Sequence, residues 1–333
     1  TTIAKTITSE NINEVYPTYY PPRKTPKECY EQIIADLTDA EQYAPDNDNS
    51  DRTKMTKTVA QAMLAKVYAE KEVQDYDKVI AYADEVMNTT GVELEDSYET
   101  LWGYDETAKD CMKRNTKEGI LEVHWTTGSG NWETWMYGRQ LDNWDYNFTW
   151  AKWITPSRDI INDFDKEGDE VRKNQAIVYY ACTWSNYYPA SNYPFMYKLR
   201  SSYNNIYWVR LADIILMKAE AEAYKGNLAE SAKLVNQIRK RAKLKELTSD
   251  KTGSKESMIE AVLHERRLEL AFEGERWFDL CRNNKVEQYL NGIDNRDSGR
   301  IRQVRQFDGN SYLLPIPQTA LDQNTNLEQN PGY

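Results

Sequence analysis

The stretch that most constrains this chain runs from Leu263 to Arg282 and reads LHERRLELAFEGERWFDLCR. Its charges of opposite sign stand three or four positions apart, the spacing at which side chains on a helix meet. A helix with one packed face is indicated by the spacing of Ile259, Val262, Leu263, Arg266 and Leu270. An arginine on a packed face needs a carboxylate partner. We therefore expect Arg266 and Arg276 to pair with carboxylates at partly buried positions.

Helices are also predicted nearer the start of the chain. Thr25, Pro26 and Glu28 form an N-terminal capping signal, and the apolar spacing that follows predicts a helix that ends at Pro45. Two further helices are predicted around residues 60–67 and 76–87. The turn between them, at residues 73–75, is short, so the two helices must be antiparallel neighbours.

This antiparallel pair has a counterpart later in the chain. Residues 62–86 and 218–238 share an Ala-x-x-Tyr step followed by a turn and a second helix rich in small residues. Each pair resembles a tetratricopeptide unit, which needs neighbours to cover its remaining apolar face. The matching tyrosines, Tyr68 and Tyr224, stand 156 positions apart, far beyond one repeat. A large insertion must therefore separate the two pairs.

The insertion, residues 97–207, has a composition of its own. Nine of the ten tryptophans lie between Trp102 and Trp208. Residues 119–125 alternate like a short strand. Residues 126–153 follow neither a helical nor a strand period and are rich in Gly, Asn and aromatic side chains, which is typical of a functional loop. Helical spacing resumes over residues 154–173.

Four segments resemble the SusD/RagB family, in family order. Residues 265–282 are similar to its "ER-x-E-(apolar)-x-x-E-G-x-R-x-x-DL-x-R" motif, and LLPIPQTALDQNTNLEQNPGY at residues 313–333 is similar to its QNPGY ending. Residues 209–227 resemble its "RyaEvlLm.AEA" helix, with Asp213 where Glu is usual, and residues 21–45 resemble an early helical segment. The family consists of surface lipoproteins that capture nutrients for Bacteroidetes outer-membrane importers.

The resemblance implies a fold and a setting. We expect a mainly α, tetratricopeptide-like scaffold with a large irregular, aromatic-rich insertion and minor β content, forming one SusD-like domain over residues 1–333. Its parts would be helical at 21–96, the insertion at 97–207, helical again at 208–290, and a connector and tail at 291–333. Family members normally carry a lipidated cysteine and a first set of helices ahead of the segment matched at residues 21–45, so the resemblance implies that the chain is the C-terminal two-thirds or so of such a protein. The expected setting is therefore the cell surface at the outer membrane, on a SusC-like TonB-dependent transporter.

Composition excludes several other classes of protein. The net charge of −11 repels a phosphate backbone, so nucleic acid is not an expected partner. No run approaches the ~20 apolar residues of a membrane span. The four cysteines are widely spaced and no Cys/His cluster exists, so no metal or other cofactor is expected. His124 and His264 lack a nucleophile beside them and are interpreted as structural residues. We therefore expect a binding protein and no enzymatic activity.

A surface for neutral sugars needs flat aromatic faces that stack on the ring, beside polar groups that grip hydroxyls. Residues 132–145 supply both. The candidate ligand-binding residues are Trp132, Trp135, Tyr137, Arg139, Asn143, Trp144 and Asp145. The alternative is that these rings form the core of an irregular subdomain. A weaker second cluster holds Tyr187, Tyr188, Tyr193 and Tyr197.

The predicted function is oligosaccharide binding as the lid of a SusC-like importer. One alternative stays within the family, where RagB-like members capture peptides. Another is a helical-repeat scaffold for protein interactions. A glycosidase would need two carboxylates about 5–10 Å apart across a cleft, and no pair stands out for that role.

Overall fold

The structure is a computed structural model that describes residues 19–105, 107–108, 110–125, 155–183, 187–200, 204–297, 303 and 305–333. Its first helix, α2 (Pro26–Tyr43), begins at the predicted capping box. The backbone N–H of Glu28 donates to the Thr25 hydroxyl, and the Glu28 carboxylate accepts from the backbone N–H of Thr25. These two bonds satisfy amide donors that a helix start leaves free.

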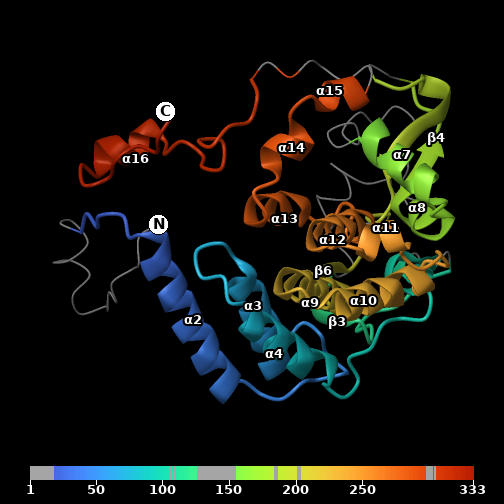
Figure 1. Cartoon of the computed structure of the whole chain (residues 1–333), viewed down its shortest axis with the longest axis horizontal. Coiled ribbons are helices and arrows are strands. Elements are labelled where there is room, and N and C mark those ends of the chain that lie inside the picture. Colours follow the sequence, from blue (N-terminus) through green and yellow to red (C-terminus); the bar gives the residue numbers. More distant parts are fainter. Residues whose placement is uncertain are drawn as a thin grey trace.

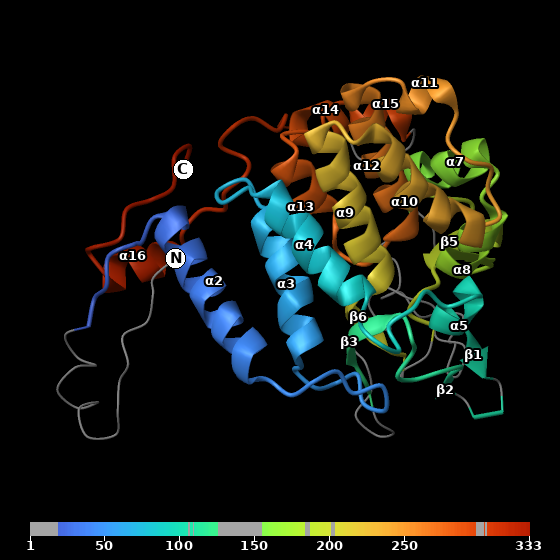
Figure 2. The ribbon, with the colours of Figure 1, turned by 60° about the horizontal axis from the view of Figure 1, so that its bottom comes forward.

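The scaffold is built from two antiparallel helix pairs, α3 (Lys57–Ala69) with α4 (Tyr76–Met87), and α9 (Leu211–Lys225) with α10 (Leu228–Arg241). Helix α4 packs directly on α9, so the pairs adjoin in space although the insertion separates them in sequence. Figure 2 shows α2, α3, α4, α9 and α10 as successive members of one helical layer. The predicted mainly α, tetratricopeptide-like fold is therefore confirmed.

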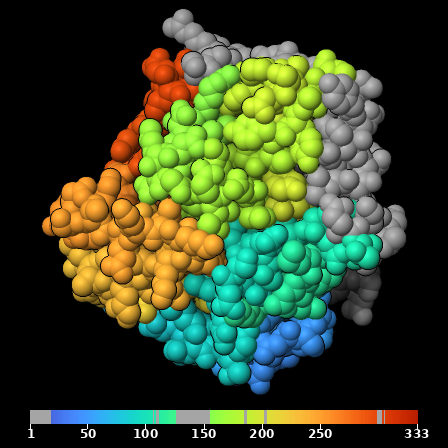
Figure 3. All heavy atoms as spheres, turned by 90° about the vertical axis from the view of Figure 1, so that its right-hand side faces the viewer, coloured from blue at the N-terminus to red at the C-terminus, as the bar shows by residue number. Residues whose placement is uncertain are grey.

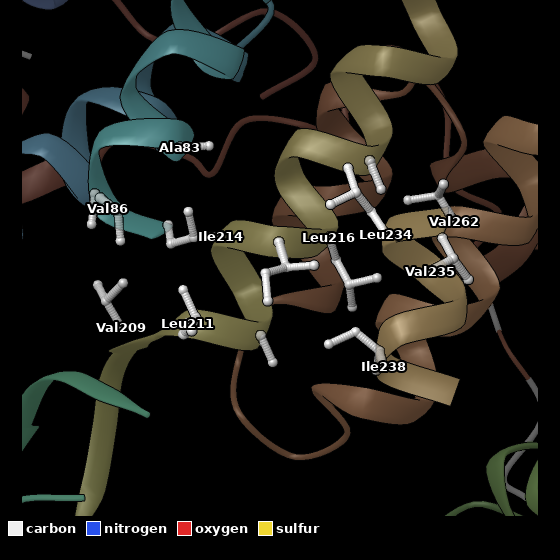
Figure 4. Packing of buried hydrophobic residues seen from close by; sticks show 14 of the residues in the cluster. Ala83, Val86, Val209, Leu211, Ile214, Leu216, Leu234, Val235, Ile238 and Val262 are labelled. Atoms are coloured by element: carbon white, nitrogen blue, oxygen red, sulfur yellow. The ribbon is translucent and has the colours of Figure 1, made fainter. Parts of the chain in front are cut away.

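The main core lies where these pairs meet. Side chains from α4, α9, α10 and α12 (Lys255–Glu269) converge on it, as Figure 4 shows for Ala83, Ile214, Leu234 and Val262. Helix α9 is central to it, because every residue from Leu211 to Ala223 is buried. A helix that is buried all round belongs inside a larger layer, which is why neither pair would be stable alone.

The insertion is attached to this layer by a two-stranded antiparallel sheet. Strand β3 (Gly119–Val123) pairs with β6 (Ile206–Arg210), with Gly119 opposite Arg210 and Val123 opposite Ile206. Two more antiparallel pairs are β1 (Tyr104–Asp105) with β2 (Asp110–Cys111), and β4 (Ile177–Tyr180) with β5 (Tyr193–Met196). The predicted minor β content is thus present.

Short helices complete the insertion and cover one side of the layer. They are α5 (Tyr98–Trp102), α7 (Arg158–Glu167), α8 (Glu170–Ala176) and the 3-10 turn η3 (Ala190–Asn192). Figure 3 shows the outer face on which the yellow-green residues of this part lie against the orange residues of the α10–α12 region.

The charged stretch that opened the sequence is divided into two helices. Helix α12 ends at Glu269 and α13 (Arg276–Arg282) begins seven residues later. The backbone between them has positive φ at Phe272 (66°) and at Gly274 (88°), a conformation that glycine adopts without strain and that no α-helix can contain. The predicted packed face is confirmed, because Ile259, Val262, Leu263, Arg266 and Leu270 are all buried.

The remaining helices among the described residues are short, one just before α12 and three between α13 and the end of the chain. They are α11 (Ser249–Thr252), α14 (Val286–Leu290), α15 (Ile293–Arg296) and α16 (Gln318–Gln323). Figure 1 shows α13, α14 and α15 following one another beside α12, with α15 next to α7. The tail after α16 returns to the first described residues, where Asn326 and Asn324 donate to the carbonyls of Tyr20 and Pro21.

Candidate functional site

A cavity of about 670 Å³ lies between the insertion and the helices that follow α12. Its lining is mainly apolar, and its walls come from α5, α7, β5, β6 and the turn from α12 into α13. Such a volume and lining are typical of a ligand pocket. The aromatic side chains in the lining are Trp102, Tyr207, Phe272, Trp277 and Tyr289.

Trp102 and Tyr207 form one aromatic corner of the cavity. Their rings meet edge to face, with centroids 5.0 Å apart and an interplanar angle of 82°. The Tyr207 hydroxyl donates to the carbonyl of Leu101, which fixes its ring. The buried indole N–H of Trp102 finds no acceptor in the described part of the chain. An unpaired buried donor is unfavourable, so this N–H calls for an acceptor that the described residues do not provide.

Trp277 supplies a second ring from the start of α13. It contacts Phe307 and Tyr312, with centroids 5.9 and 6.4 Å away. Trp277 is only half-buried and lines the cavity. The cavity therefore has aromatic faces on two of its walls.

Lys198 is one of the cations that line the cavity. Its Nζ lies 2.5 Å from Glu273 Oε1 and 3.1 Å from the carbonyl of Glu269, and 4.7 Å from the centroid of the Trp102 ring. Burial lowers the pKa of Lys198 to about 8, and the neighbouring Glu273 only partly opposes that shift. Lys198 therefore loses its proton, and its charge, at a lower pH than an ordinary lysine.

A dense set of buried ion pairs begins at the cavity wall and extends into the fold. Arg266 is fully buried and pairs with Asp213 at 2.7 Å and with Asp279 at 2.8 Å. The pKa of Asp213 stays low because Lys66 and Arg266 outweigh the effect of burial. Asp213, the departure from the family motif, is therefore a working partner of the buried arginine.

The same set extends around Glu269 and Glu265. Arg210 bridges Glu118, Glu269 and Glu273 at 2.7–2.8 Å. The remaining pairs of the set join Arg172 to Asp169, Glu265 and Glu269, Arg239 to Glu265 and Glu167, Arg241 to Glu118 and Glu269, and Arg282 to Glu220 and Asp279. Such networks hold a scaffold in one arrangement and leave no charge free for a ligand.

The prediction of carboxylate partners is confirmed for Arg266 and wrong for Arg276. Within the described residues Arg276 has no ion pair. Its Nη1 donates to the carbonyl of Leu263 at 3.0 Å, and its guanidinium lies 4.7 Å from the centroid of the Tyr289 ring. The reason is the break after Glu269, which turns Arg276 away from the packed face of α12 and toward the cavity.

The seven predicted ligand-binding residues lie outside the described residues. The described chain on either side of that stretch ends beside the cavity. Thr155 lines the cavity directly and shares a hydrogen bond with the Tyr193 hydroxyl at 2.9 Å. On the other side, Arg114 donates both to the carbonyl of Trp125 and to Asn205, which lines the cavity.

The second aromatic cluster is engaged in the fold. Tyr188 contacts both Tyr187 and Tyr193 edge to face, and its hydroxyl donates to the carbonyl of Pro156. Arg158 covers the rings of Tyr187 and Tyr188 at 4.6 and 4.1 Å. The two histidines contact carboxylates, His124 with Glu122 at 2.7 Å and His264 with Glu167 at 3.1 Å.

The described residues provide neither a metal site nor a membrane-crossing helix. No group of three His, Cys, Asp or Glu side chains in the described ranges is placed to hold a metal ion. Of the helices found there, none has the length and apolarity that crossing a membrane requires.

Comparison with known proteins gives a consistent set of relatives. The SusD family matches residues 24–333. SusD-like protein P2 of Formosa agariphila is 28% identical over 93% of this chain, and the chain spans 66% of P2. A SusD homolog from Bacteroides thetaiotaomicron has a TM-score of 0.75 at 21% identity, over 98% of this chain and 74% of that one.

A laminarin-binding SusD-like protein has a TM-score of 0.69 at 24% identity, over 93% of this chain and 70% of that protein. At these identities the solved structures support only the fold, and the family match is the evidence for common descent. The scaffold of helix pairs, the aromatic insertion between them and the match over residues 24–333 agree, so this chain belongs to the SusD family.

Proposed function

We propose that this chain binds an oligosaccharide in the 670 Å³ cavity and acts as a capture protein without hydrolytic activity. The observation that carries the proposal is the pairing of aromatic faces with polar groups in one cavity of a SusD-family chain. Tryptophan and tyrosine faces stack on sugar rings, as the half-buried Trp277 ring could, while Ser157 and Arg276 in the same lining are suited to hydroxyl groups. The laminarin-binding relative supports a glycan as the ligand class.

The aromatic stretch between Trp125 and Thr155 belongs to the same proposal. Thr155, on one side of it, lines the cavity, so Trp132, Trp135, Tyr137, Arg139, Asn143, Trp144 and Asp145 are proposed to extend the binding surface from the cavity outward. A long saccharide would then contact both parts. This arrangement would give hot-spot rings at the centre and polar contacts at the rim.

The setting is proposed from the family. The protein would be held at the cell surface by a lipid anchor on an N-terminal segment and would sit as a lid on a SusC-like TonB-dependent transporter. The chain spans 66% of P2, and the matched segments span 25% and 51% of two further SusD-like proteins. The transporter partnership and the anchor are therefore tested on the full-length protein, by co-purification from outer membranes.

The ligand site is tested by calorimetry with neutral β-glucan, α-glucan and xylan oligosaccharides and with a peptide panel. Trp277→Ala, in the cavity lining, should lose about 2 kcal/mol or more of binding free energy, as a hot-spot ring does. Trp208→Ala is the matched control, because Trp208 is 60% exposed and is not among the lining residues of the cavity.

Three outcomes would contradict the proposal. Loss of binding in the Trp208 variant but not in the Trp277 variant would place the site outside the cavity. Binding of peptides with no glycan binding would favour the peptide-capturing branch of the family. Release of reducing sugars that disappears with a single carboxylate substitution would make the protein a hydrolase.

A further inference from the structure

A second, polar pocket of about 320 Å³ opens beside the large cavity. It lies among α7, α12, α13, α14 and α15, and four of its residues, Asp159, Arg267, Arg276 and Tyr289, also line the large cavity. A ligand in the cavity could therefore place one group in the pocket. The other lining residues are Asp163, Lys166, His264, Gln288 and Arg296.

The pocket carries an excess of positive charge in a chain whose net charge is −11. Its permanently cationic side chains are Lys166, Arg267, Arg276 and Arg296, against the carboxylates Asp159 and Asp163. The acidic groups just outside are already engaged. Glu167 pairs with Arg239 and His264, and Glu260 pairs with Lys285.

The ion pairs inside the pocket neutralise only part of its positive charge. Arg267 contacts Asp159 at 2.8 Å and Asp163 at 2.6 Å, and Arg296 contacts Asp159 at 3.3 Å. Burial opposes ionisation of Asp159, but Arg267 and Arg296 outweigh it and hold its pKa below the ordinary value. Both carboxylates are therefore already paired with arginine.

Arg276 is the cation that these pairs leave over. Among the described residues its hydrogen bond goes to the carbonyl of Leu263, and its guanidinium rests against the Tyr289 ring. Burial, and then the nearby Arg267, lower its pKa below the usual arginine value. Arginine stays charged even so, so Arg276 presents an uncompensated guanidinium at the junction of the two cavities.

We propose that the pocket binds the carboxylate of an acidic saccharide, with Arg276 as the main contact and Lys166 at the entrance. This rests on the proposed function, since it adds a preference for a uronic-acid unit to oligosaccharide capture. A planar guanidinium matches a carboxylate with two parallel hydrogen bonds, and a partly buried site strengthens them. Arg267, fixed between its two aspartates, holds one wall of the pocket in place.

The test compares three small probes by ligand-observed NMR titration: D-glucuronate, its uncharged methyl ester and glucose 6-sulfate. We expect glucuronate to bind at least about ten-fold more tightly than the ester, a difference of about 1.4 kcal/mol. Arg276→Gln should abolish that preference, and Lys166→Gln should reduce it at an exposed position where folding is not at risk. Arg23→Gln, at an exposed arginine outside the pocket, should leave it unchanged.

Any of the following results would overturn the inference. Equal affinity for glucuronate and its ester, or detectable binding of neither, shows that the pocket does not select a carboxylate. Tighter binding of the sulfate than of glucuronate assigns the pocket to sulfated sugars instead. A preference that survives in a folded Arg276→Gln variant places the anion elsewhere. None of these results touches neutral-glycan capture, which the calorimetry with Trp277→Ala measures separately.

Discussion

Arg266 and Arg276 stand ten positions apart in one motif, yet they lie in opposite surroundings. Arg266 is fully buried in the wall of the cavity and contacts two aspartates. Arg276 is half-buried, faces the cavity and the polar pocket, and contacts a carbonyl and a ring. Around Arg266 each buried charge is thus paired with an opposite charge. Around Arg276 a positive charge remains available for a ligand. The number of carboxylates within reach, and not burial alone, separates a structural arginine from a binding one.

The largest expected effect sharpens this contrast. Arg266→Met leaves the buried carboxylates of Asp213 and Asp279 without one partner and should reduce the free energy of unfolding by about 3–5 kcal/mol. Arg276→Met breaks no ion pair among the described residues and should lower it by less than about 1 kcal/mol. Urea unfolding of both variants measures the difference. Similar losses in the two variants would show that the two arginines do not differ in role.

Much of the scaffold could be predicted from sequence because local rules determine it. The capping box at Thr25 fixes the start of α2, and the Ala-x-x-Tyr steps identify the two helix pairs. Those pairs repeat a known packing unit, so their contact across the insertion follows from the need to bury the apolar residues of α9. The buried position of Arg266 likewise follows from the helical spacing of its neighbours.

The cavity could not be found in this way. Its walls come from segments far apart in the chain, such as Trp102, Tyr207 and Trp277, and no spacing rule links them. The break after Glu269 also reversed the expectation for Arg276. Gly274 was a visible signal for that break, since a glycine within a helical pattern often marks a positive φ. The seven residues proposed from the aromatic stretch remain a prediction.

The second prediction concerns Lys198, on the cavity side of the comparison. Its pKa is about 8 in the folded protein, below the ordinary value of 10.5, so the folded state loses this proton first as pH rises. Stability therefore increases with pH between about 8 and 10.5, on the order of 3 kcal/mol. Lys198→Met lacks this group, and Glu273 still keeps Arg210 at 2.7 Å.

The measurement is the difference in unfolding free energy between wild type and Lys198→Met at pH 7, 8, 9 and 10. We expect the difference to shift toward wild type as pH rises, because the charged amine that burial disfavours is being neutralised. A shift in the opposite direction would mean that Glu273 stabilises the ammonium more than burial opposes it. Lys198 would then belong with the charges around Arg266, which are fully paired with carboxylates.

The smallest effect is expected where the two regions meet, at Glu167, which contacts Arg239 of the ion-pair set at 3.0 Å and His264 of the polar pocket at 3.1 Å. The hydrogen bond from His264 and the pairing with Arg239 lower the pKa of Glu167 from 4.5 to about 2. Its contribution to stability is complete above about pH 4.5 and is lost as pH falls toward 2. Because the side chain is 26% exposed, we expect this contribution to be about 1–2 kcal/mol.

Glu167→Gln should therefore destabilise the protein at pH 6 and be as stable as wild type near pH 2. Glu246→Gln, at an exposed position, should leave stability unchanged at both pH values. Arg239 retains Glu265 at 2.9 Å, so the variant does not orphan an arginine. An effect of Glu167→Gln that is the same at both pH values would show that its carboxylate charge does not couple the two regions.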